Sequence, residues 1–163
     1  RVVMSAAATG SVRAAALRIF NAAGAAKGLG DEHGTRIITR AAAAAAGRVT
    51  HVDVFGDGTA VRDFVHVNDI GSAFVAVLNN LADEASAENY GVFNVGATPA
   101  TVSEVIEAAG RLSDTEIAKR HRPASPSEAR ELRADTTRLR GLGWRPKRSD
   151  MDQLVRDEFA EFA

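Results

Sequence analysis

Apolar residues recur along this chain at two spacings, one typical of strands and the other of helices. Short apolar or alternating runs predict strands over residues 13–20, 50–55, 60–67 and 90–95. Helical spacing predicts helices over residues 35–46, from Asn68 or Asp69 to about residue 81, from Thr101 onward, and from Met151 to Phe162. Strands that alternate with helices in this way predict an α/β protein.

Capping residues indicate where these helices begin and end. Gly47 ends the helix over residues 35–46, because glycine readily adopts the left-handed conformation that closes a helix. Asn68 or Asp69 is expected to cap the next helix. Thr101 and Glu104 have the spacing of a capping box and predict a helix start.

Two segments rich in glycine, proline and polar residues, 21–34 and 121–127, are expected to be loops. The helix that follows Asn68 or Asp69 is expected to pack through one apolar stripe. Its members are Ile70, Ala73, Phe74, Val77, Leu78 and Leu81.

Composition narrows the class of protein. The chain has 163 residues, which suits one domain, and its apolar and charged contents of 45% and 25% are those of a soluble globular protein. A net charge of -1 gives no electrostatic case for nucleic acid. No apolar run approaches the ~18 residues that a membrane span needs. With no secretory signal either, we expect a cytoplasmic location and no membrane partner.

The sequence lacks the residues that several kinds of catalytic or binding site require. There is no cysteine, and His33, His51 and His121 show no metal-ligand spacing, so no metal site is predicted. Tyr90 is the one tyrosine and is not followed by a lysine four positions later. None of the 14 glycines forms a Gly-x-Gly-x-x-Gly turn. The chain also begins at Arg1, in a stretch that reads as a helix, so we expect an upstream part.

Four motifs occur in the order found in one enzyme family. They are LRIFNAAGA at residues 17–25, VFGDG followed by VRDFVHVND at 54–58 and 61–69, VFNVG at 92–96, and AD at 134–135 with LGWRP at 142–146. Together they resemble the UDP-glucose 4-epimerases, which are extended short-chain dehydrogenase/reductase enzymes. The resemblance extends over the whole chain.

The resemblance implies a fold, a cofactor and a reaction. Residues 1–163 would be a single C-terminal substrate-binding region of an extended Rossmann-type enzyme, with the dinucleotide-binding part absent. The complete enzyme would use NAD and interconvert UDP-glucose and UDP-galactose by transient oxidation at sugar C4. The family's catalytic tyrosine and lysine lie upstream of Arg1, so no catalytic residue is assigned here and this chain alone is expected to be inactive. The longer protein would be a homodimer.

The same resemblance assigns roles to Arg62, Asn21 and Phe20. Arg62 would contact the diphosphate, for which a guanidinium is well suited; the alternative is a pair with Asp63 or a solvated side chain. Asn21 would bond the substrate at a strand end, or else satisfy turn backbone. Phe20 would lie against the nicotinamide of the cofactor, or simply pack in the core.

Further positions would hold the nucleotide. Val54 and Phe55 would flank the uracil, mainly through backbone groups. Arg36 and Ile37 begin the helix that caps the diphosphate, although Arg36 could equally be a solvated helix-end arginine. Glu128 would face the ribose hydroxyls.

Other residues of the motifs receive structural interpretations or depart from the family. His66 is expected to be structural, and Trp144 to pack near the last helix. Phe64 stands where the family commonly has tyrosine. Ser125 replaces a second phosphate arginine, for which Arg122 could substitute.

Two other functions remain open on the sequence. The chain could belong to a nucleotide-sugar 4,6-dehydratase or reductase of the same family. It could also be a non-catalytic remnant or binding module that keeps the fold. A glycine-rich turn and a Tyr-x-x-x-Lys pair encoded upstream would favour an enzyme.

Overall fold

The structure is a computed structural model that describes residues 2–31, 34–83, 89–124, 126 and 128–162. Its helices are α1 (Val2–Ala8), α2 (Ile37–Ala45), α3 (Val67–Ala82), α4 (Val102–Ser113), α5 (Thr137–Gly141) and α6 (Met151–Ala160). Its strands are β1 (Ala14–Ile19), β2 (Asn21–Ala23), β3 (Val52–Phe55), β4 (Val61–His66), β5 (Tyr90–Val95), β6 (Thr98–Thr101) and β7 (Lys119–Arg122). The predicted α/β class is confirmed.

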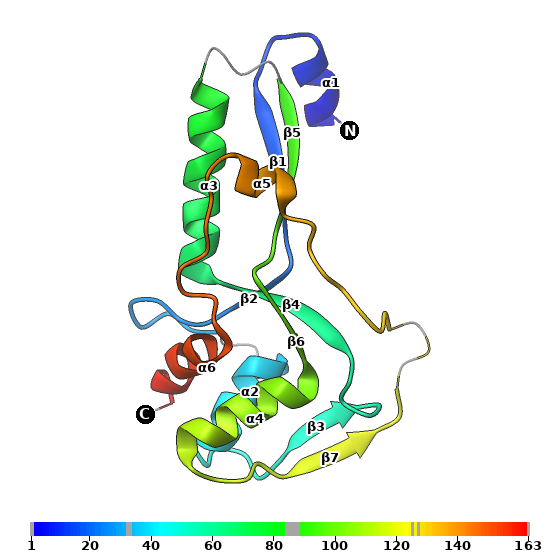
Figure 1. Cartoon of the computed structure of the whole chain (residues 1–163), viewed down its shortest axis with the longest axis vertical. Coiled ribbons are helices and arrows are strands. Elements are labelled where there is room, and N and C mark those ends of the chain that lie inside the picture. Colours follow the sequence, from blue (N-terminus) through cyan, green and yellow to red (C-terminus); the bar gives the residue numbers. More distant parts are fainter. Residues whose placement is uncertain (1, 32–33, 84–88, 125, 127, 163) are drawn as a thin grey trace.

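The strands form three small sheets. β1 pairs with β5 in parallel, and β3 pairs with β7 in parallel. Between these two pairs, β4 is the central strand of a third sheet, parallel to β2 and antiparallel to β6. In Figure 1 the β1–β5 pair stands at one end of an elongated molecule with α1, α3 and α5, while α2, α4, α6, β3 and β7 form the other end. The sheet around β4 therefore connects the two ends.

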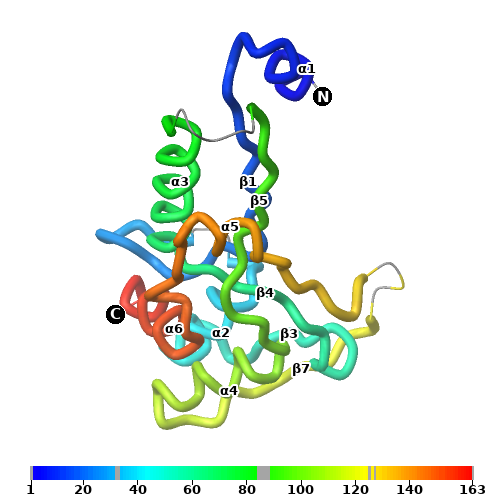
Figure 2. The backbone as a smooth tube through the Cα atoms, turned by 45° about the horizontal axis from the view of Figure 1, so that its top comes forward, coloured from blue at the N-terminus to red at the C-terminus, as the bar shows by residue number. Residues whose placement is uncertain are grey.

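Each end of the molecule has its own hydrophobic core. One core lies where α3 and α5 pack beside the β1–β5 pair, and its buried members are Val65, Ala73, Val77, Phe93, Val95, Leu139 and Trp144. The other lies among α2, α4, α6 and β3, and its largest fully buried members are Val52, Val54, Val105, Ile106, Leu154 and Val155. Figure 2 shows α4 and α6 gathered around α2, away from the β1–β5 pair. Because β4 contributes Phe64 to one core and Val65 to the other, its position is fixed from both sides.

Two predicted helix ends are confirmed in detail. Gly47 has a φ of 71° and donates its N–H to Ala44, while Arg48 donates to Ala43, the double closure that left-handed glycine permits. At the start of α4, Glu104 N–H donates to Thr101 Oγ1 at 3.1 Å. The Thr101 N–H in turn donates to Glu104 Oε2 at 2.6 Å, which completes the capping box.

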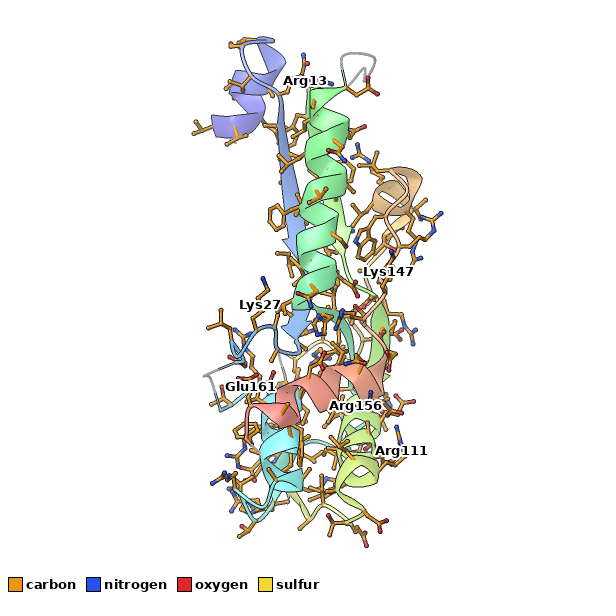
Figure 3. The ribbon with its side chains drawn as sticks, turned by 90° about the vertical axis from the view of Figure 1, so that its left-hand side faces the viewer. Arg13, Lys27, Arg111, Lys147, Arg156 and Glu161 are labelled. Atoms are coloured by element: carbon orange, nitrogen blue, oxygen red, sulfur yellow. The ribbon has the colours of Figure 1, made fainter. Side chains whose placement is uncertain are left out.

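The predicted cap of α3 was wrong. The N-cap is His66, whose imidazole Nδ1 accepts the Asn68 N–H at 3.0 Å. Asp69 is buried and accepts instead from the backbone N–H groups of Lys147 and Arg148, at 2.9 and 2.8 Å. Its carboxylate therefore fastens a distant segment of chain to the start of α3. Figure 3 shows Lys147 beside this part of α3.

The sequence pattern did not predict several short elements. β2 lies inside the expected loop 21–34, β7 extends into the expected loop 121–127, and β6 and α5 were not predicted. β2 has three residues, and all four side chains of β7 are exposed, so neither strand has an apolar alternation to detect. These strands exist because β4 and β3 offer them backbone partners.

The packing of α3 differs from its predicted stripe. Ala73 and Val77 are buried as expected, but Phe74 and Leu78 are 45% and 60% exposed. The buried face is narrower because Ala73 and Val77 are the α3 residues in this core, against the β1–β5 pair, β4 and the segment with Trp144. The Trp144 indole N–H donates to the Asp69 carbonyl at 3.1 Å, so Trp144 packs on α3 and not, as expected, near the last helix.

A buried acid links α6 to α2 and predicts a pH effect. Glu158 is 1% exposed, and its Oε1 accepts the Thr39 hydroxyl at 2.9 Å. Burial raises the pKa of this carboxyl, so the folded state binds the proton more tightly than the unfolded state. The free energy of unfolding therefore falls as pH rises from the unfolded pKa toward the folded one.

Removing that charge should change the pH dependence of stability. We expect the free energy of unfolding of Glu158→Gln, measured relative to that of the unmodified chain, to increase as pH rises from about 4 to 8. The gain is about 1.4 kcal/mol per unit by which folding raises the pKa. Urea titrations across this range measure the difference.

Glu104→Gln is the matched control. The capping box lowers the pKa of Glu104, so its charge is favoured in the folded state. The free energy of unfolding of Glu104→Gln, relative to that of the unmodified chain, should therefore decrease as pH rises. A Glu158→Gln difference that is flat with pH, or that follows the direction of Glu104→Gln, would contradict the account.

Candidate functional site

A cavity of about 530 Å³ lies where the sheet around β4 meets α2 and β3. Residues from six separate stretches of the sequence line it. They are Asn21, Gly34, Thr35, Ile37, Arg40, Val52, Asp53, Phe55, Ala60, Arg62, Val102 and Glu128. A volume of several hundred cubic ångströms suits a small organic ligand. The lining mixes apolar side chains with charges of both signs, which suits a ligand that has an organic ring and an anionic group.

Arg62 is held firmly at the edge of this cavity. It lies on β4, and its side chain is 15% exposed. The guanidinium Nη1 donates to the carbonyls of Val61 and Ala129, at 2.8 and 2.9 Å, and Nη2 pairs with Glu128 Oε1. The alternative pairing with Asp63 was wrong, because the Asp63 carboxylate bonds to two backbone amides elsewhere. Arg62 thus presents a positioned cation to the cavity.

Asn21 lies at the start of β2, two positions after the last residue of β1. β2 pairs with β4 in parallel, with Asn21 opposite Phe64. The side-chain amide donates to the Asp63 carbonyl at 3.0 Å, and the residue lines the cavity. The Asn21 side chain therefore bonds to the backbone, which was the alternative role predicted for it. The residue also borders the space where a ligand would lie.

Three further predicted residues border the same space. Ile37 is the first residue of α2, and Phe55 is the last residue of β3, with 58% of its surface exposed. Glu128 reaches the cavity from the segment that follows β7. The structure thus brings together Asn21, Ile37, Phe55, Arg62 and Glu128, which the sequence places up to about a hundred residues apart.

Three predicted residues do not line this cavity. Arg36 precedes α2, is 55% exposed at its side chain, and has its Nε 3.4 Å from Asp31 Oδ2. The Val54 side chain is 1% exposed and belongs to the hydrophobic core beneath β3. Phe20 is half-buried between β1 and β2, where its N–H donates to the Val95 carbonyl at 3.0 Å.

Sequence reasoning missed two charged residues of the lining, Arg40 and Asp53. Arg40 follows Ile37 by three positions on α2, and Asp53 precedes Phe55 by two on β3. Helix and strand periodicity place such pairs on one face. The signal was therefore available once Ile37 and Phe55 had been chosen.

Asp53 remains ionised across the physiological range. Its Oδ1 accepts from the Arg120 Nε at 2.6 Å, and Arg122 Nε lies 3.4 Å from the same oxygen. The pKa of Asp53 is lowered to about 2, chiefly by the hydrogen bond from Arg120. Arg122, considered as a substitute phosphate ligand, thus pairs with Asp53. Ser125, at the position of the family's second arginine, lies outside the described residues.

The glycine-rich turn typical of a dinucleotide site is missing from this sequence. The sequence has no Gly-x-Gly-x-x-Gly turn between a strand and a helix, the arrangement that seats a pyrophosphate on helix N–H groups. β4 passes directly into α3, and β6 passes directly into α4. Phe20 is the one residue here for which a cofactor contact was predicted, and the structure does not test that contact.

The described part of the chain contains neither a metal-binding cluster nor a membrane-spanning helix. It brings together no set of three or more His, Asp or Glu side chains that could hold a metal ion. None of its helices has the length and apolar character needed to cross a membrane.

Comparison with known proteins gives one consistent family. Residues 1–96 match the model of the NAD dependent epimerase/dehydratase family. A UDP-glucose 4-epimerase of Lacticaseibacillus casei is 32% identical over 154 residues, which cover 86% of this chain and 45% of that protein.

Solved structures agree with the sequence comparison. A UDP-glucose 4-epimerase from Stenotrophomonas maltophila, solved with bound NAD and formylated UDP-arabinopyranose, superposes with a TM-score of 0.86 at 32% identity. The alignment covers 99% of this chain and 51% of that one. The enzyme from Brucella ovis, solved with NAD, gives a TM-score of 0.86 at 31% identity, covering 99% and 52%. The chain spans about half the length of the relatives it matches, and its fold is that of extended short-chain dehydrogenase/reductase enzymes.

Proposed function

The chain belongs to the NAD dependent epimerase/dehydratase family, and we propose that residues 1–163 are the substrate-binding region of a UDP-glucose 4-epimerase. One observation carries the proposal. Asn21, Ile37, Phe55, Arg62 and Glu128, which the family resemblance assigns to the substrate, border a single cavity. The complete protein would interconvert UDP-glucose and UDP-galactose, with NAD held by a part that this chain does not contain.

The lining suggests how a UDP-sugar would be held. A diphosphate would lie against Arg62, because three of the guanidinium's five N–H donors are used within the described residues and the others are available. Glu128 would turn from Arg62 toward the ribose hydroxyls as the diphosphate arrives. Phe55, exposed at the end of β3, would cover one side of the base, with the β3 backbone at its edge.

The task of this chain is therefore to bind, and the proton and hydride transfers would take place on residues outside it. An epimerase must hold the nucleotide firmly while the sugar turns to present both of its faces. Contacts to the nucleotide and none specifically to the sugar are assigned to this chain, which suits that requirement. NAD, when bound, would supply reversible oxidation at sugar C4. We also place the complete protein in the cytoplasm as a homodimer, by analogy with the family.

The product identifies the reaction. This chain, joined to its NAD-binding half, should convert UDP-galactose to UDP-glucose, measured by chromatography of the nucleotide sugars. A 4-keto-6-deoxy sugar product would indicate a 4,6-dehydratase and would contradict the epimerase assignment. No turnover by a folded holoenzyme would favour a binding module.

The 163-residue chain alone should neither epimerise UDP-galactose nor bind NAD tightly. The reason is the absence of a glycine-rich turn and of a Tyr-x-x-x-Lys pair from its sequence. Calorimetry with NAD measures the second statement. A micromolar dissociation constant for NAD would be incompatible with the assignment of this chain to the substrate side.

A further inference from the structure

Asp63 is a buried carboxylate that joins two distant parts of the chain. It is 3% exposed and lies on β4 between Arg62 and Phe64. One oxygen accepts the Ala97 N–H at 2.7 Å, and the other accepts the Ala134 N–H at 2.8 Å. Both oxygens thus bind backbone, one at the end of β5 and one in the segment before α5.

Gly96 makes room for this arrangement. A Cβ at residue 96 would lie 2.7 Å from the Asp63 Cγ and 2.6 Å from the Ala134 Cβ, closer than real atoms approach. Only glycine allows the carboxylate and residue 134 to come this near. The close packing therefore gives the Asp63 carboxylate one position.

The segment that Asp63 holds is the one that carries Glu128. Between Glu128 and Ala134 this segment runs along β4, with Val61 N–H donating to the Arg130 carbonyl at 2.9 Å and Leu132 N–H to Val61 at 3.1 Å. Residues 130–133 are exposed, so little side-chain packing fixes them. The Ala134 bond to Asp63 is the part-buried anchor at the end of this otherwise exposed segment.

Asp63 also contacts Asn21, which lines the cavity. Its backbone carbonyl accepts the Asn21 side-chain amide at 3.0 Å. Its neighbour Arg62 donates to the Ala129 carbonyl and pairs with Glu128, on the same anchored segment. One residue thus contacts the elements that place Asn21, Arg62 and Glu128.

We propose that Asp63 is a positioning residue for nucleotide binding. Its buried carboxylate clamps the segment 128–134 against β4, and this clamp sets Glu128 and the Ala129 carbonyl beside the Arg62 guanidinium. The inference rests on the proposed function for the identity of the ligand. The clamp itself rests on the hydrogen bonds, the burial and the Gly96 contact.

Asp69 provides a matched control in the same chain. It is 4% exposed and, like Asp63, accepts from two backbone amides, those of Lys147 and Arg148. It also accepts the Ser149 hydroxyl at 2.6 Å. None of these residues lines the cavity. The two carboxylates share burial and chemistry but differ in the segment that they hold.

The test compares Asp63→Asn with Asp69→Asn. In each variant one acceptor oxygen becomes an amide donor that faces a backbone N–H, so both should lose stability. Only Asp63→Asn should raise the dissociation constant for UDP, by about tenfold, because it alone loosens the segment beside Arg62. A change in UDP affinity that is equal in the two variants, or absent from both, would overturn the proposal.

Proteolysis tests the clamp without a ligand. Arg130 and Arg133 are exposed trypsin sites within the clamped segment. Under native conditions, Asp63→Asn should be cut there about tenfold faster than Asp69→Asn of comparable stability. Equal cleavage would refute the clamp. Failure of the unmodified chain to bind UDP would instead refute the proposed function and leave the proteolysis result to decide on Asp63.

The unmodified chain gives a further measurement if Asp63→Asn does not fold. The Ala134 amide should exchange with deuterium about ten times more slowly than the neighbouring Arg133 amide, because its N–H is held by the buried carboxylate. UDP should slow the Ala134 exchange further. An Ala134 amide that exchanges as fast as that of Arg133 would contradict the proposal.

Discussion

Arg62→Ala should raise the dissociation constant for UDP by about 10- to 100-fold, equivalent to about 1.5–3 kcal/mol of binding free energy. The variant removes the positioned guanidinium that borders the cavity beside Asn21 and Glu128. A charge-assisted bond to a diphosphate is among the stronger hydrogen bonds in proteins. Titration calorimetry of the folded variant with UDP measures the loss.

Two controls separate ligand binding from structure. Arg62→Lys keeps the charge but loses the planar fork, so its affinity should fall between those of the unmodified chain and Arg62→Ala. Arg111→Ala removes an exposed arginine that pairs with Asp152 and does not line the cavity, and should leave UDP affinity unchanged. UDP affinity that survives Arg62→Ala would assign Arg62 to holding Glu128 and Ala129 alone.

Gly24→Ala should lower the free energy of unfolding by about 2–4 kcal/mol. Gly24 has a φ of 74°, which disfavours a side chain, and a Cβ there would lie 2.4 Å from His66 Cδ2. The His66 ring cannot move aside easily, because it is fully buried and its Nε2 lies 2.9 Å from Asp157 Oδ2. The variant therefore combines backbone strain with overpacking of a buried ring.

Gly28→Ala is the matched control for the backbone contribution. Gly28 has a φ of 75°, and a Cβ there meets nothing within 4 Å. Its loss should be about 1 kcal/mol, from conformation alone. Urea unfolding of both variants gives the difference that belongs to His66. Equal losses would show that the contact between Gly24 and His66 contributes nothing.

Periodicity and capping chemistry predicted the longer elements because these signals are local. α2, α4 and α6 have apolar stripes, and Gly47, Thr101 and Glu104 act on the backbone within one turn of themselves. β2 and β7 could not be predicted in this way, because their stability comes from partners far away in the sequence. The predicted burial of the outer face of α3 was wrong for a related reason, since the local sequence does not indicate how much of a helix other elements cover.

The candidate site shows the same division. The motifs around Asn21, Phe55 and Arg62 marked these residues individually, and helical or strand spacing would have added Arg40 and Asp53. Their gathering around one cavity depends on β4 lying beside β2, and on the return of the segment with Glu128. The backbone-binding roles of Asp63 and Asp69 had no local signal, because each carboxylate meets amides at least 34 positions away.

Nuclear magnetic resonance titration of the 163-residue chain with UDP tests most directly whether this cavity binds the nucleotide. The account predicts saturable shifts of the backbone amides of Asp53, Phe55 and Arg62 and of the Asn21 side-chain amide, with the α3 amides unchanged. The same titration of Arg62→Ala should need about ten times more UDP or more. Shifts that map to the surface of α3, or no saturable shift at millimolar UDP, would contradict the assignment of the cavity to a UDP-sugar.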